Sequence, residues 1–252
     1  MAAGPFARRR AATAARVCGR YTLKATAAEL ADVFELVSVP AVAPRWNLTP
    51  SQQGLIVRSG QPRVATQAQW GFRHGAGAGP IPVNARSETV AQKPLFRAAV
   101  ATQRALVLAD GYYEWRRTPD GASTHKQPFY ISAPGGRPFA MAGIWASAAV
   151  GDDGAMVDTF CVLTTTPNAL LATIHDRMPV LLGRKGAALW LDEAPTAQQA
   201  RLDILRPCPT DWLQAWPVSA LVNSPRNDAP ACCAQAPLTP PPQGSLLGFD
   251  GR

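Results

Sequence analysis

Residues 54–72 read GLIVRSGQPRVATQAQWGF, two apolar-rich runs separated by turn-forming residues. The first run is Gly54–Arg58, the second is Arg63–Phe72, and Ser59–Pro62 supplies glycine and proline between them. In the second run alternate residues share one face: Val64, Thr66, Ala68 and Trp70. The stretch therefore predicts two strands joined by a turn.

The rest of the chain continues with short strands and a few helices between them. Further strands are predicted at Ala105–Ala109, Tyr112–Trp115, Phe129–Ser132, Phe139–Trp145, Thr159–Thr164 and Trp216–Val222. Helices are predicted at Ala27–Leu36 behind a Thr26–Glu29 capping box, as a short helix broken at Pro94, from Thr166 to Ile174, and from a Thr196–Gln199 capping box to just before Pro207. The prolines of PRWNLTPS, residues 44–51, predict an extended, rigid loop. This order indicates one α+β domain with largely antiparallel sheets.

Length and composition allow one sizeable core or at most two small domains, because the chain has 252 residues and is 47% hydrophobic. No stretch approaches the apolar length of a membrane span. The net charge is +8, of which four arginines before residue 18 supply +4, so the rest is mildly basic and fits an anionic partner or simple solubility equally well. The five cysteines form no C-x-x-C pair and no zinc-type cluster, and they favour a reducing compartment: Cys18, Cys161, Cys208, Cys232 and Cys233. We expect no metal and no cofactor.

The two ends of the chain differ in composition from the middle. Residues 1–17 are Arg-rich and acid-free. This composition is compatible with an organelle transit peptide, a disordered tail, or upstream sequence translated from a misplaced start codon. In the third case, the codon of Val17 would be the true GTG start. We favour the misplaced start over a genuine leader. Residues 229–252 are Pro-rich, with PLTPPPQG at their centre, and are predicted to be a disordered tail in which Cys232 and Cys233 have no chemical role.

Taken singly, the candidate catalytic residues have ordinary structural explanations. A lone Cys or His is more often packed or structural, Glu114 could be a charge at a strand end, and Asn84 could be a turn residue. Two segments nevertheless place polar groups directly beside apolar runs, NARSET at 84–89 and IHDRMP at 174–179, as sequences that line a site do. We interpret His74 and His125 as solvated surface.

Nine motifs occur in the order found in one known family: VCGRYTL, PRWNLTPSQ, WGF, NARSETVAQKPLFR, LADGYYEW, KQPFYI, FAMAGIW, VLTTTPNALLATIHDRMPVLL and PVSALVNSPRND. The sequence resembles the SRAP family, the SOS response-associated peptidases or abasic-site processing proteins, over residues 17–228. The resemblance implies a single α+β domain over residues 18–228, with largely antiparallel, barrel-like sheets flanked by short helices. The sequence departs from the family pattern after WGF, where RHGAGAGPIP stands in place of a Pro-Ser-Trp segment and a longer loop.

The resemblance also implies residues and chemistry. It assigns catalysis to Cys18, Asn84, Glu114 and His175, and DNA contact or site shaping to Arg20, Arg86, Trp115 and Arg177. In the family the Cys is the N-terminal residue and bonds to abasic sites in single-stranded DNA. A terminal amine, with a pKa near about 7.7–8.0, can form a Schiff base with the sugar aldehyde, and the thiol of the same residue can close a thiazolidine ring. An internal Cys18 could not do this, because its nitrogen is an amide.

Three functions remain open from the sequence. The first is abasic-site crosslinking with lyase activity and self-cleavage before Cys18, which explains the peptidase name. The second is an N-terminal-nucleophile amidohydrolase, in which Cys18 attacks an amide with its own amine as base. The third is a non-catalytic single-stranded DNA binder. For the first function, we expect a monomer in the cytoplasm of a bacterium, located at the nucleoid and taking part in the SOS response. Its partner is expected to be single-stranded DNA, and no membrane is expected to be involved.

Overall fold

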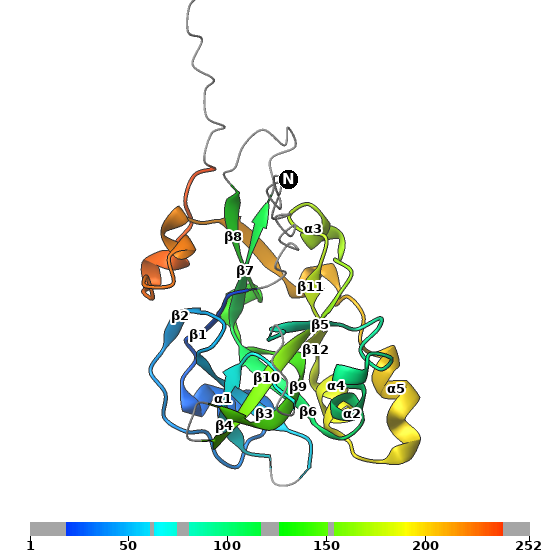
Figure 1. Cartoon of the computed structure of the whole chain (residues 1–252). Helices are drawn as coiled ribbons and strands as arrows, with labels where there is room; N and C mark the ends of the chain where they lie inside the picture. Colours follow the sequence, from blue (N-terminus) through cyan, green and yellow to red (C-terminus); the bar gives the residue numbers. More distant parts are fainter. Residues whose placement is uncertain (1–18, 61–62, 75–80, 117–125, 151–153, 239–252) are drawn as a thin grey trace, which may run out of the picture.

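The computed structural model describes residues 19–60, 63–74, 81–116, 126–150 and 154–238, and their strands form two sheets (Figure 1). The smaller sheet has the order β13-β8-β7-β1-β2 and contains β1 (Tyr21–Leu23), β2 (Arg45–Leu48), β7 (Gly111–Arg116), β8 (Gln127–Ser132) and β13 (Gln214–Pro217). The larger sheet contains β3 (Gln53–Arg58), β4 (Ala65–Trp70), β5 (Asn84–Arg86), β6 (Arg104–Ala109), β9 (Phe139–Val150), β10 (Ala155–Thr165), β11 (Met178–Pro179) and β12 (Leu181–Leu182). The helices are α1 (Ala27–Phe34), α2 (Pro94–Thr102), α3 (Ala169–Ala172), α4 (Arg184–Leu191) and α5 (Gln198–Asp203). None of these helices is long and apolar enough to cross a membrane.

The hairpin predicted from residues 54–72 is confirmed, since β3 and β4 pair antiparallel from Gln53↔Gln69 to Val57↔Ala65. Most other pairings are antiparallel too, as predicted, and β10 is the exception because it pairs parallel with β4 and β5. In the path β10-β4-β3-β6-β9 the two long strands β9 and β10 also pair with each other, in antiparallel orientation. The prediction of an α+β fold is therefore confirmed.

Several predicted boundaries are wrong for identifiable reasons. The capping box at Thr26 and Glu29 forms, but α1 ends at Phe34 because Glu35 adopts a left-handed conformation with φ 54°. Pro94 begins α2 instead of breaking a helix, as suits a residue that lacks an N–H. Helix α3 starts after Asn168 and not after Thr166, because β10 continues to Thr165, which pairs with Met178.

Other differences concern elements that the sequence did not predict or placed differently. The expected loop at residues 44–51 contains β2, which pairs with β1. Residues 184–191 form α4, and the predicted capping box at Thr196 does not form, because Thr196 lies in a 3-10 turn before α5. The last strand ends at Pro217, and residues 220–223 form a 3-10 segment instead.

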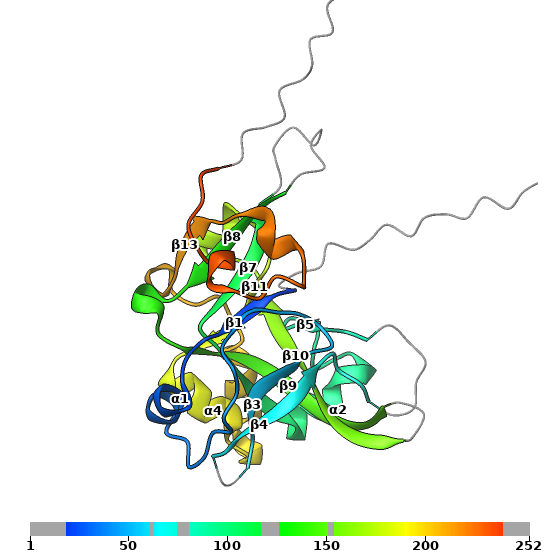
Figure 2. The ribbon, with the colours of Figure 1, turned by 90° about the vertical axis from the view of Figure 1, so that its left-hand side faces the viewer.

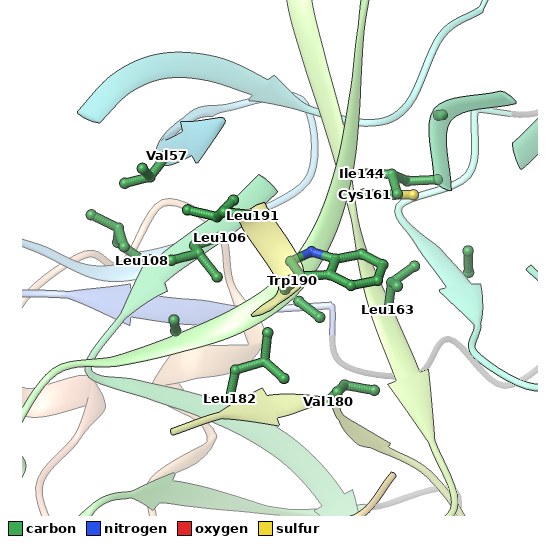
Figure 3. Packing of buried hydrophobic residues seen from close by; sticks show 14 of the residues in the cluster. Val57, Leu106, Leu108, Ile144, Cys161, Leu163, Val180, Leu182, Trp190 and Leu191 are labelled. Carbon is green, nitrogen blue, oxygen red and sulfur yellow. The ribbon is translucent and has the colours of Figure 1, made fainter. Parts of the chain in front are cut away.

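Helices cover one face of the larger sheet and bury the main core with it. Figure 3 shows Trp190 of α4 among side chains of the sheet, where its indole N–H donates to the carbonyls of Ala105 (3.0 Å) and Gly143 (3.2 Å). The buried Arg104 guanidinium donates to the carbonyls of Trp190 (2.7 Å) and Asp192 (2.7 Å) at the end of α4, and to carbonyls in the last turns of α2. Arg104 thus caps two helix C-termini at once and fixes both to β6.

A second apolar cluster lies between the two sheets and supports the candidate site. It joins one face of the larger sheet, through residues such as Phe160 and Val162, to Tyr21 and Tyr112 of the smaller sheet. The chain crosses from β6 to β7 over a single buried residue, Asp110, whose carboxylate accepts hydrogen bonds from the Thr22 hydroxyl (2.5 Å) and from the backbone N–H groups of residues 24 and 25. Figure 2 shows the smaller sheet stacked against the larger one along this junction.

The outer face of the smaller sheet carries a third cluster that includes residues predicted to be disordered. The tail prediction is wrong for residues 229–238: residues 230–232 form a 3-10 turn, and Val218 bridges to Gln235. Cys233 lies 3.0 Å from the Tyr113 hydroxyl through its sulfur, and its carbonyl accepts the Trp216 indole N–H at 2.9 Å. The folded part therefore extends at least ten residues beyond the predicted boundary at 228, while residues 239–252 lie outside the described part.

Candidate active site

Three of the four predicted catalytic residues come from different elements and face the same region. In β5, Ala85 belongs to the main core, so Asn84 and Arg86 point to the opposite side, toward the cluster between the sheets. In β7, Tyr112 belongs to that inter-sheet cluster, so Glu114 two residues later shares its face. His175 follows α3 and lies next to Ile174 of the same cluster. Figures 1 and 2 both show β5 and β11 beside the junction with β7.

Glu114 and His175, two of the predicted catalytic residues, lie close together in the site. Nε2 of His175 lies 3.9 Å from Oε2 of Glu114, and the two side chains are 10% and 1% exposed. This separation is longer than a direct hydrogen bond, but it is short enough for a strong electrostatic interaction in a buried setting. A carboxylate and an imidazole held this close can exchange a proton through one intervening group.

The backbone around His175 gives each of its protonation states a partner. The N–H of Arg177 donates to Nδ1 of His175 at 3.1 Å, which requires a lone pair on Nδ1 and places the proton of the neutral ring on Nε2, facing Glu114. The Asp176 carboxylate lies 3.0 Å from the same Nδ1 and would accept from it if that nitrogen were protonated. Protonation of Nδ1 would therefore exchange the Arg177 N–H donor for the Asp176 carboxylate acceptor.

Arg177 is held by protein groups. Its guanidinium donates to both carboxylate oxygens of Glu88, at 2.6 and 2.9 Å, and to the carbonyl of Thr164 at 2.5 Å. The hydrogen bond from Arg177 lowers the pKa of Glu88 below its ordinary value, against a smaller opposing effect of burial. The pair links the loop after β5 to the segment that carries His175.

Arg20 and Trp115 are joined through the loop that follows β13. Nη1 of Arg20 donates to the carbonyl of Val222 (2.5 Å) and to Oδ1 of Asn47 (3.2 Å), and Nη2 donates to the carbonyl of Asn223 (2.6 Å). The indole N–H of Trp115 donates to Oδ1 of Asn223 at 2.8 Å, and Cζ of Arg20 lies 5.8 Å from the indole ring centre. Burial lowers the pKa of Arg20, although an arginine stays cationic at neutral pH.

A groove of about 900 Å³ runs beside this group. One side is lined by Gly19, Arg20, Trp115 and Asn223. The remaining lining comes from the turn at residues 49–51, from Trp70 and Gly71, from Ile81 and Val83, and from Pro225. Its size and mixed polar and aromatic lining suit an extended ligand with flat rings. Ile81, near the end of the segment that follows WGF, lines the groove, while residues 75–80 lie outside the described part.

The remaining predicted site residues have the following places. Arg86 is exposed at the end of β5, and within the described residues no hydrogen bond or ion pair holds its side chain. Cys18 lies outside the described residues, as does His125, while His74 is exposed as predicted. In the described part of the chain no group of three or more His, Cys, Asp or Glu side chains could hold a metal ion.

The sequence reasoning missed three residues that organise the site: Asn47, Glu88 and Asn223. Each lies inside a quoted motif, but each acts on a residue far away in the chain, as Glu88 does on Arg177 and Asn223 on Trp115. Such pairs leave no periodic signal. Glu88 could have been suspected as the carboxylate of NARSET, the only one in that segment.

The described residues thus combine an α+β scaffold with a buried Glu114–His175 contact and a groove lined in part by Trp70 and Trp115. The sequence model of the family described as SOS response associated peptidase (SRAP) matches residues 17–225, and the chain belongs to that family.

Relatives and solved structures agree with this membership. The chain is 32% identical to the abasic site processing protein YoaM of Bacillus subtilis, over 84% of this chain and 96% of that protein. It is 28% identical to the abasic site processing protein YedK of Escherichia coli, over 84% of this chain and 96% of that protein. A crystal structure of a Bordetella bronchiseptica protein covers 80% of this chain and 100% of its own, at 27% identity and a TM-score of 0.67. A Bacteroides thetaiotaomicron protein shares the fold with a TM-score of 0.72 at 24% identity, over 87% of this chain and 100% of its own.

Proposed function

We propose that this protein processes abasic sites in single-stranded DNA by forming a thiazolidine between Cys18, as the N-terminal residue, and the sugar aldehyde. The observation that supports this most directly is the buried Glu114–His175 contact at 3.9 Å, which shares its region with Asn84. Gly19, which follows Cys18 in the sequence, lines the adjacent groove. The relatives named as abasic site processing proteins support the same substrate.

The proposed reaction has two bond-forming steps. The amine of Cys18 adds to C1′ of the open sugar, and loss of water gives an imine. The Cys18 sulfur then adds to the imine carbon, and its proton passes to the nitrogen, which closes the five-membered ring. Both nucleophiles belong to one residue, and the sequence of steps needs no metal or cofactor.

The described residues supply proton transfer and positioning. Nε2–H of His175 would donate to the ring oxygen as the cyclic sugar opens, and Glu114 would accept and return protons during imine formation and ring closure. Asn84 would hydrogen-bond the opened sugar. Arg20 and the exposed Arg86 would pair with phosphates, which makes binding salt-dependent. The imine would also permit strand cleavage by β-elimination, and cleavage before Cys18 would remove residues 1–17.

The surroundings of the reaction belong to the same proposal. We place the protein as a monomer on single-stranded DNA in the bacterial cytoplasm and nucleoid, in the response to DNA damage from which the family takes its name. The mildly basic charge of the chain after residue 17 supports an anionic partner.

Intact mass spectrometry with an abasic single-stranded oligonucleotide tests the proposal. A chain that begins at Met followed by Cys18 should lose the Met and give a stable one-to-one adduct, whereas Cys18→Ala should give none. Cys18→Ser keeps the amine but lacks the thiol, so it should give an adduct only when borohydride reduces the imine. The full chain, in which the Cys18 nitrogen is an amide, should react only after residues 1–17 are removed. If the chain beginning at Met-Cys18 gives no adduct although its N-terminal Cys18 is exposed, the proposal is wrong.

A further inference from the structure

Asn223 connects two groups that line the groove. Its side-chain oxygen accepts the indole N–H of Trp115 at 2.8 Å, and its carbonyl accepts Nη2 of Arg20 at 2.6 Å. Asn223 itself also lines the groove and is exposed there. The two contacts use different parts of the residue, so a change of the side chain removes the contact to Trp115 and leaves the contact to Arg20.

The loop that carries Asn223 is fixed without that side chain. The buried Asn47 amide donates to the carbonyls of Val222 (3.3 Å), Ser224 (3.0 Å) and Asn227 (2.7 Å). The Asp228 carboxylate accepts the backbone N–H groups of residues 46 and 47, at 2.6 and 2.9 Å, and Nε of Arg45 at 2.5 Å. The acceptor of the Trp115 indole therefore sits on a braced backbone segment and has a defined position.

An indole needs such an anchor if it is to present one face to a ligand. The Trp115 ring is only partly buried, and it packs at the edge of the outer cluster on β7. Its N–H is held by Asn223 on one side of the groove, and the Arg20 guanidinium lies 5.8 Å from its ring centre. With these contacts the side chain is confined near one rotamer, and without the contact to Asn223 the ring could turn about its Cβ–Cγ bond.

We propose that Asn223 is a positioning residue that fixes the Trp115 ring as a stacking surface for the nucleobase next to the abasic site. The inference rests on the proposed function and specifies how the groove holds the strand. Base stacking on an aromatic side chain tolerates any base and contributes a substantial part of single-strand affinity. A preorganised ring gives more of that affinity than a mobile one, because less freedom is lost when the base binds.

Two oligonucleotides test this role through their binding affinities. Both oligonucleotides carry a tetrahydrofuran abasic analogue, which has no aldehyde and cannot crosslink. In the first oligonucleotide the nucleotides next to the analogue are adenines, and in the second they are further tetrahydrofuran units without a base. Asn223→Ala should weaken binding of the adenine-flanked strand about tenfold and leave binding of the base-free strand unchanged. Asn223→Asp keeps an acceptor for the indole and should restore the preference for flanking adenines. The matched control is Leu221→Ala, an exposed position of the same 3-10 segment, which should change neither affinity.

A double-variant cycle gives the second readout. Adding Asn223→Ala to Trp115→Leu should produce no further loss, because Asn223 acts through the ring. Equal losses on both strands, additive losses in the cycle, or no loss at all would overturn the inference. Failure of the proposed function shows differently: the unaltered protein would bind the analogue strands but form no adduct with an aldehyde-bearing strand. If the unaltered protein binds neither analogue strand, the inference is wrong, whereas the proposed function is decided by the adduct with an aldehyde-bearing strand.

Discussion

Replacing Arg177 by glutamine distinguishes a brace for His175 from a phosphate contact. The family resemblance predicts DNA contact for Arg177, but its guanidinium is bonded to Glu88 and Thr164, and its backbone N–H holds Nδ1 of His175. If Arg177 is a brace, its loss should reduce stability and the rate of adduct formation. If it contacts phosphate, its loss should mainly reduce the salt dependence of DNA binding.

The size of the stability effect follows from the contacts. The pair with Glu88 is partly exposed, with side chains 11% and 44% accessible, so it contributes about 1 kcal/mol. The charged hydrogen bond to the Thr164 carbonyl contributes about 1.5 kcal/mol more. Arg177→Gln should therefore lower the free energy of unfolding by about 2.5 kcal/mol and Tm by about 5–10 °C, while Glu88→Gln should cost about 1 kcal/mol and about 2–4 °C. The double variant should be no less stable than Arg177→Gln alone, because both changes remove the same ion pair.

Thermal unfolding and a salt titration of single-strand binding measure both quantities. In Arg177→Gln the slope of log affinity against log salt should stay at the value of the unaltered protein. The matched control is Arg86→Gln, an exposed arginine without such partners among the described residues, which should lower the slope by about 0.7 and leave Tm unchanged. The reasoning is refuted if Arg177→Gln lowers the slope by about 0.7 and leaves Tm where it was.

Two further predictions concern stability. The pKa of Glu88 is lowered from its ordinary value of 4.5 mainly by the Arg177 hydrogen bond, so the stability that the ionised Glu88 contributes is fully present above pH 4.5 and is lost as the pH falls through the lowered pKa. Denaturant unfolding curves of the unaltered protein and of Glu88→Gln should therefore differ at pH 7 and converge in acid. A difference that stays constant with pH would contradict this. Arg104→Met leaves the carbonyls at the ends of α2 and α4 without their buried donor. It should lower the free energy of unfolding by about 3–5 kcal/mol in the same assay. A loss below about 1 kcal/mol would show that these carbonyls find other partners.

Local patterns in the sequence predicted the elements that depend on local physics. The hairpin at residues 54–72 and the capping box of α1 both formed, because turn residues and caps act within a few positions. Helix α4 was missed because RKGAALWL has a glycine at its third position and no side-chain cap. Its C-terminal carbonyls are satisfied by Arg104, which lies about eighty-six positions earlier in the chain. Strand β2 was missed because the prolines on either side of it, Pro44 and Pro50, suggested a loop. Two of its backbone N–H groups donate to the distant Asp228.

The site was predictable only in part, and for a different reason. No local pattern brings Asn84, Glu114 and His175 to one region; the family resemblance named them, and the fold accounts for their common face through the alternation of β5 and β7. The contacts that orient Trp115 and Arg177 cross 108 and 89 positions of sequence. Each contact depends on which distant strands become neighbours within a sheet, which the local sequence pattern does not encode.

The segment that packs Cys233 against Tyr113 lies beyond the residues that the family model matches but within the folded domain. Similarity to the family ends at residue 225, yet the chain continues to bury aromatic surface up to the neighbourhood of Gln235. The surface that it covers belongs to β7, the strand that carries Glu114 on its other face. The folded unit therefore extends beyond the residues that the family model matches. A chain cut at residue 225 would expose the back of the strand that carries Glu114.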